Sequence, residues 1–191
     1  RATVSRQVRY LQPECGGGKS MRYLKMFAVM VCAVALLVPC AASAAVKVGD
    51  PAPEFELPVW GSDASFKLAD MKGKKAVVIA ITQSACSSCR TELDLLNNYV
   101  GQGDLEVVTI NVDARGGTEK WNGLMTQIVK DAGWKMPVLV DPKYSVPRMF
   151  GVRATPGLIV IGKDGTIKAI EIGFVPGEDN ESFSKIVEAE K

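Results

Sequence analysis

Apolar and polar positions alternate in blocks along the chain, and the blocks predict strands and helices in a regular order. A continuous apolar, β-branched run at 76–81 predicts a strand that is covered on both faces. A helical pattern with one apolar side follows over 87–100, and Gly101 marks its end. The same reasoning predicts further strands at 105–112, 137–140, 158–161 and 166–172, and helices at 119–132, 144–150 and 181–191.

Shorter patterns complete the predicted fold. Segments 55–57 and 65–68 alternate like short strands, with a turn at 61–63 between them. Lys163-Asp164-Gly165 predicts a hairpin between the last two strands, and Pro147 is expected to break its helix. This order predicts an α/β fold: a central mixed sheet with helices on both faces and an N-terminal β-hairpin extension.

The region before this fold has the layout of a secretory signal peptide. Basic residues at 21–25 precede an apolar run at 26–38 and a small-residue segment at 41–45. The apolar run is shorter than the roughly 20 residues that span a bilayer. We expect cleavage after Ala44, and an uncleaved membrane anchor is the alternative.

The predicted organisation therefore has three parts. Residues 1–20 precede Met21, and we expect them to be upstream sequence translated in frame rather than native protein. Residues 21–44 form the signal peptide or anchor, and 45–191 form one domain. Export places this domain in the periplasm or another extracytoplasmic compartment, in contact with a membrane only if the leader remains as an anchor.

Composition narrows the possible functions. The 191-residue chain carries 23 Lys and Arg against 21 Asp and Glu, so its charge does not indicate nucleic acid or an anionic membrane as a partner. It contains no histidine. This excludes Cys-His and Ser-His nucleophile pairs and histidine-ligated metal sites.

The cysteines supply the candidate chemistry. Cys15, Cys32 and Cys40 lie before the predicted domain, which keeps only Cys86 and Cys89. A Cys-x-x-Cys pair that follows a buried strand at a helix start is typical of redox-active dithiols. The helix N-terminus favours a thiolate on Cys86, the expected nucleophile. Cys89 lies one turn further on, where it can resolve the mixed disulfide.

Other uses of two cysteines are less well supported. A structural zinc site needs about four ligands, and a purely structural disulfide closes too small a loop to stabilise much. A Cu(I) site needs a third soft ligand. The candidate methionines are better explained as core fillers, so we expect no metal and no cofactor; these methionines are Met71, Met125, Met136 and Met149.

Further segments match a known family. Ala154-Thr155-Pro156-Gly157 directly precedes the strand at 158–161. With the Cys86–Cys89 pair, the chain from Val48 to Ile172 resembles the thioredoxin superfamily, most closely its TlpA/ResA-type exported branch, which overlaps the AhpC/TSA and redoxin families. The other matching segments are 48–55, Arg90, Glu92, 146–151 and Asp164-Gly165.

The resemblance implies a thioredoxin-like fold and roles for several residues. Pro156 would follow a cis bond and pack beside the two sulfurs, and the backbone of Thr155 would bind the substrate strand. The alternative for Pro156 is an ordinary proline at a strand entry. Glu92 would lie near the active-site cavity and influence thiol protonation, and its alternative is a solvated helix charge.

Three positions depart from the family pattern. Ala85 stands where the family usually has Trp, Ser88 where it has Pro, and Gly157 where Thr is common. The residues between the cysteines, Ser87 and Ser88, tune the redox potential. The direction of electron flow is therefore left open by the sequence.

The resemblance implies a periplasmic thiol–disulfide oxidoreductase that acts on protein thiols and disulfides. We expect it to serve as a reductant, supplied by a membrane or periplasmic electron donor, as in cytochrome c maturation. One alternative is a peroxiredoxin-like thiol peroxidase, although Ile79 and Gln83 stand where that chemistry wants Pro and Thr or Ser. The other is a non-enzymatic binding module.

Overall fold

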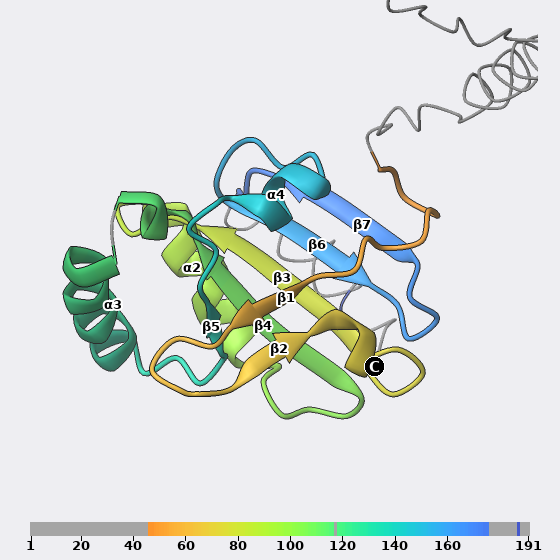
Figure 1. The fold of residues 1–191 in the computed structure, drawn as a ribbon, viewed down its shortest axis with the longest axis horizontal. Helices are drawn as coiled ribbons and strands as arrows, with labels where there is room; N and C mark the ends of the chain where they lie inside the picture. Colours follow the sequence, from red (N-terminus) through yellow and green to blue (C-terminus); the bar gives the residue numbers. More distant parts are fainter. Residues whose placement is uncertain (1–45, 117, 176–186, 188–191) are drawn as a thin grey trace, which may run out of the picture. The chain divides into compact units, whose positions relative to one another are not determined.

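A mixed five-stranded sheet forms the centre of the fold (Figure 1). The computed structural model describes residues 46–116, 118–175 and 187. The sheet order is β5-β4-β3-β6-β7, in which β3, β4 and β5 are parallel and β6 and β7 are antiparallel to their neighbours. The strands are β3 (Ala76–Thr82), β4 (Leu105–Asn111), β5 (Val138–Leu139), β6 (Gly157–Ile161) and β7 (Ile167–Ile172).

An N-terminal hairpin lies beside this sheet. It pairs β1 (Glu56–Pro58) with β2 (Ser65–Lys67) in antiparallel register, as the sequence predicted. The backbone N–H of Trp60 donates to the carbonyl of Val138 at 2.8 Å, which links the hairpin to β5.

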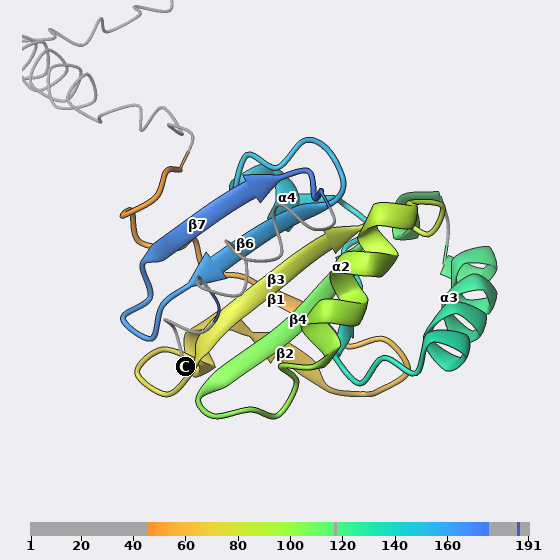
Figure 2. The same ribbon diagram turned by 180° about the vertical axis from the view of Figure 1, so that it is seen from behind.

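Helices cover both faces of the sheet, as expected. Helix α2 lies over β3 and β4 on the face turned toward the viewer in Figure 2, and α4 lies on the opposite face with the hairpin (Figure 1). The helices are η1 (Leu68–Asp70), α2 (Ser87–Asn97), η2 (Val112–Gly116), α3 (Thr118–Ala132) and α4 (Ser145–Met149).

Several details differ from the sequence-based expectations, among them β5, which covers only Val138–Leu139 rather than 137–140. Helix α2 ends at Asn97, three residues before the predicted end. Pro147 does not break α4, because it is the third residue of the helix, where the backbone N–H has no partner within the helix in any case. The predicted leader (1–44) and most of the predicted helix at 181–191 lie outside the described residues.

The alternating side chains of β3 divide the core into two layers. Val77, Ile79 and Ile81 pack with the hairpin and α4. Ala76, Val78 and Ala80 pack with α2 and with Val187. All seven residues of β3 are buried, which explains its continuous apolar run. A central strand of this kind is a rigid support for the turn that follows it.

Candidate active site

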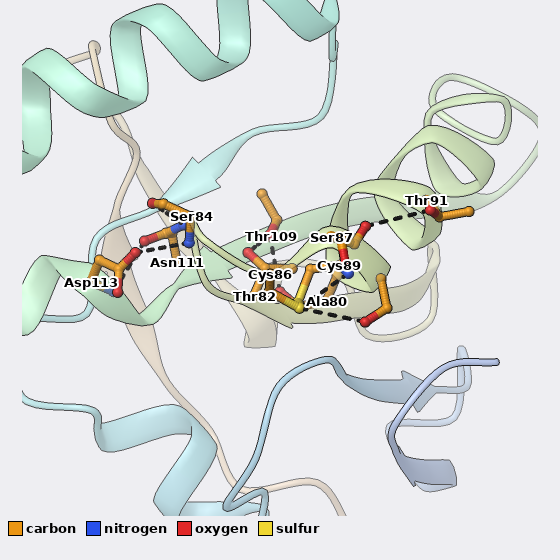
Figure 3. The surroundings of a disulfide bond; sticks show 11 residues. Ala80, Thr82, Ser84, Cys86, Ser87, Cys89, Thr91, Thr109, Asn111 and Asp113 are labelled. Atoms are coloured by element: carbon orange, nitrogen blue, oxygen red, sulfur yellow. Dashed lines mark hydrogen bonds between the residues drawn. A yellow bond between two sulfur atoms is a disulfide. The ribbon is translucent and has the colours of Figure 1, made fainter. Parts of the chain in front are cut away.

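Cys86 and Cys89 form a disulfide at the start of α2 (Figure 3). A short turn leads from the end of β3 to Cys86 and is closed by a hydrogen bond from the Cys86 N–H to the Gln83 carbonyl at 3.2 Å. Cys86 is the N-cap residue of α2, with extended backbone, and Cys89 lies in the first helical turn. The sequence therefore placed both cysteines correctly in the local structure.

The two sulfurs differ in exposure and in their contacts. The sulfur of Cys86 accepts a hydrogen bond from the backbone N–H of Cys89 across 3.2 Å and lies 3.8 Å from the hydroxyl of Ser88. Cys86 is half-buried, whereas Cys89 exposes 1% of its surface. Donors at a helix N-terminus stabilise negative charge on a sulfur. Cys86 is thus the cysteine that a large partner can reach and the one whose thiolate the helix favours.

The segment with Thr155 and Pro156 lies at the same end of the sheet. The Thr155–Pro156 peptide bond is cis. Gly157 is paired with Ile81 across β3 and β6, so that Pro156 stands beside the place where β3 gives way to the cysteine turn. Pro156 is buried and Thr155 is half-buried. The structure thus brings this segment and the disulfide, 70 residues apart in sequence, to one edge.

Gly157, where the family commonly has Thr, has little room for a side chain. A Cβ atom at this position would lie 2.4 Å from Cγ1 of Val152 and 3.3 Å from the carbonyl oxygen of Ala154. Val152 is fully buried in the core layer next to α4. A side chain at 157 is therefore incompatible with the present packing of Val152.

Glu92 lies on the buried side of α2, one turn after Cys89, and exposes 1% of its surface. The alternative interpretation as a solvated helix charge is therefore wrong.

Ser87 is exposed and Ser88 is half-buried, so both are near the surface between the two cysteines. Met125 and Met136 are buried in apolar clusters, as expected of core fillers.

Sequence reasoning missed a group of polar residues next to the cysteine turn. Asp113 and Asn111 follow or end β4, and they bind Ser84 of the turn through its N–H and its hydroxyl. The Thr82 and Thr109 hydroxyls lie 3.2 Å apart, and that of Thr109 donates to the Ala80 carbonyl. The signal was present in the sequence: polar side chains at the carboxyl ends of two strands that are adjacent and parallel.

The described part of the chain holds neither a metal-binding cluster nor a membrane-spanning helix. There, His, Cys, Asp and Glu side chains do not gather in groups of three that could hold a metal ion. None of the helices in these residues has the length and apolar character needed to cross a bilayer.

Comparisons with known proteins agree with this fold and with the Cys86–Cys89 disulfide. The model of the AhpC/TSA family matches residues 48–170. No curated protein matches the chain. Among solved structures, a proposed thiol:disulfide interchange protein DsbE from Chlorobium tepidum is similar, with 28% identity and a TM-score of 0.64; the match covers 76% of this chain and 98% of that one.

Two further structures extend this similarity. A hypothetical protein from Sinorhizobium meliloti is 25% identical, with a TM-score of 0.62, over 77% of this chain and 85% of that one. A secreted Mycobacterium tuberculosis disulfide oxidoreductase, homologous to E. coli DsbE, shares the fold at 19% identity and a TM-score of 0.58, over 71% and 95% of the two chains. The expected thioredoxin-like fold is confirmed.

Proposed function

Because the chain belongs to the AhpC/TSA family, we propose that its Cys86–Cys89 pair reduces disulfides in protein substrates outside the cytoplasm. The chain is a DsbE-like thiol–disulfide oxidoreductase; the proposal concerns its substrates, its direction and its compartment. The observation that carries it is the asymmetry of the pair, with a reachable Cys86 at the helix start and a buried Cys89 behind it.

The reaction takes place in two exchanges of sulfur bonds. In the reduced protein, the Cys86 thiolate attacks a disulfide of the substrate, forming a Cys86–substrate bond and releasing one substrate thiolate, which takes a proton from water. Cys89 then loses its proton and attacks the Cys86 sulfur, which releases the second substrate thiolate. The substrate disulfide gains two electrons, and the protein ends with the Cys86–Cys89 disulfide. A dithiol of a membrane or periplasmic donor restores the reduced state.

Neighbouring residues serve the two exchanges. The backbone of Thr155 hydrogen-bonds to the extended substrate segment, and Pro156 orients that segment toward Cys86. Glu92 influences the protonation of the thiols from the buried side of α2. Ser87 and Ser88 set the redox potential of the Cys86–Cys89 couple. For this two-electron couple, a difference of 30 mV corresponds to about 1.4 kcal/mol.

Two lines of support favour the proposed compartment. The sequence before residue 45 has the layout of a signal peptide, and one structural relative is described as secreted. A similar protein is described as a thiol:disulfide interchange protein, which supports exchange with protein disulfides; the proposed role in cytochrome c maturation rests on the family resemblance alone.

Insulin reduction by the purified protein tests the activity. We expect the wild type to reduce insulin with dithiothreitol as donor, and Cys86→Ser to be inactive. Cys89→Ser, reduced first and then incubated with insulin after the dithiothreitol is removed, should accumulate a mixed disulfide visible by mass spectrometry. Cys86→Ser is the matched control, since it should form no such adduct. A Cys86→Ser variant with full activity would contradict the assignment of the nucleophile.

Two further measurements separate the remaining functions. Rapid peroxide consumption without insulin reduction would indicate a thiol peroxidase, and a disulfide inert to both would indicate a binding module. The equilibrium of the 86/89 couple with glutathione gives the direction. A potential well below that of glutathione is expected for a reductant, and one well above it would overturn that role.

A further inference from the structure

Ser84 lies in the turn before Cys86 and is held by residues that end or follow β4. Its backbone N–H donates to the Asp113 carboxylate across 2.8 Å, and its hydroxyl accepts from Nδ2 of Asn111 across 3.3 Å. The hydrogen bond that closes the turn uses the N–H of Cys86 instead. Asp113 thus accepts from the Ser84 N–H, which makes no hydrogen bond within the turn, and connects the turn to the end of β4 (Figure 3).

Asn111 holds Asp113 in the position that this contact needs. Its side-chain oxygen accepts from the backbone N–H of Asp113 and from the indole N–H of Trp121, each at 3.0 Å. Because the oxygen receives two N–H donors, the amide nitrogen must face Ser84. Asn111 is itself buried, with 4% exposure. The network is therefore built on the end of β4 and has one consistent donor pattern.

We propose that Asp113 is a positioning residue for disulfide exchange, and that its carboxylate holds the cysteine turn so that the Cys86 sulfur stays beside Cys89 once the disulfide is open. This inference rests on the proposed function. In the oxidised protein the disulfide holds the sulfur of Cys86 against that of Cys89 in α2. In the dithiol and the mixed disulfide that covalent link is broken, and hydrogen bonds to the turn remain.

The second exchange depends most on this restraint. The sulfur of Cys89 must meet the Cys86–substrate bond in line, and a misplacement of about 1 Å is enough to slow such a step about 100-fold. Loss of the Asp113 contact releases the N–H of Ser84, two residues before Cys86. The mixed disulfide would then form normally and resolve slowly.

Three variants test the proposal by insulin reduction and by the lifetime of the mixed disulfide. Asp113→Ala should lower kcat/KM about tenfold and accumulate the mixed disulfide. Asp113→Asn should stay within about threefold of the wild type, because its amide oxygen can accept the same N–H. Asn97→Ala is the matched control: it removes a 2.8 Å bond from the Lys135 N–H at the other end of α2 and should change neither readout.

A fourth variant keeps the test decisive if Asp113→Ala does not fold. Ser84→Pro removes the N–H donor, together with the hydroxyl that Asn111 binds, and Pro fits the first central position of a turn. It should reproduce the slow resolution, and adding Asp113→Ala to it should have little further effect. Normal resolution in both Asp113→Ala and Ser84→Pro, or equal losses in Asp113→Ala and Asp113→Asn, would overturn the proposal. Inactivity of the wild type would instead refute the proposed function.

Discussion

Cys89 and Glu92 lie one turn apart on the buried side of α2, and each exposes only 1% of its surface. Cys89 must lose a proton before it can resolve a mixed disulfide, and bulk water has little access to it. A carboxylate on the same side of the helix can take part in that proton transfer.

We expect Glu92→Gln to slow insulin reduction at least about tenfold at pH 7, since a positioned general base typically contributes 100-fold or more. The deficit should narrow as pH rises, because Cys89 then ionises without assistance. The measurement is the pH profile of kcat/KM. Asp94→Asn is a matched control on the same helix: Asp94 is exposed and accepts from the Trp134 indole at 2.7 Å. A deficit that does not vary with pH would indicate a purely structural role for Glu92.

Gly157 cannot carry a side chain without displacing Val152. We expect Gly157→Ala to lower the free energy of unfolding by about 1–3 kcal/mol, the usual cost of overpacking, as measured by urea denaturation. Adding Val152→Ala to the Gly157→Ala variant should recover the part of the unfolding free energy that the clash removes.

Gly123→Ala provides the control for this substitution. Gly123 lies within α3, and a Cβ there would have no atom within 4 Å. Helix propensity predicts a gain of up to about 1 kcal/mol. If both glycine variants change stability by the same amount, steric conflict with Val152 is not the cause.

Asp164, in the turn between β6 and β7, should make the stability of the fold depend on pH in the acid range. Hydrogen bonds from the backbone N–H of Thr166, from its hydroxyl and from Lys168 lower the pKa of Asp164 from 3.8 to about 2. Since this folded-state pKa lies below the ordinary value, these bonds stabilise the protein above about pH 4, and the contribution is lost as pH falls toward 2.

Urea unfolding of the wild type and Asp164→Asn at several pH values checks this expectation. The stability advantage of the wild type should shrink between pH 4 and pH 2, because the amide does not titrate in that range. The comparison cancels the other carboxylates, which both proteins share. An advantage that stays constant down to pH 2 would show that the charge of Asp164 does not contribute.

Local patterns in the sequence account for much of the fold and for the two cysteines. The apolar run of β3 required burial on both faces, and the helical pattern after it placed Cys86 at an N-terminus and Cys89 one turn later. The hairpin at Asp164-Gly165 followed from its turn residues. Each of these features depends on residues close together in the chain, so a single stretch of sequence carries the whole signal.

Only the tertiary structure decided which residues that are distant in sequence meet around the disulfide. The bond between Ser84 and Asp113 joins residues 29 positions apart, and the approach of Val152 to Gly157 depends on how α4 packs against the sheet. The sequence was equally compatible with an exposed and a buried Glu92, because helix periodicity does not show which elements pack against each side of α2. Such contacts depend on strand register and on the packing of layers, which form only when the whole chain is folded, and periodicity in one segment contains neither.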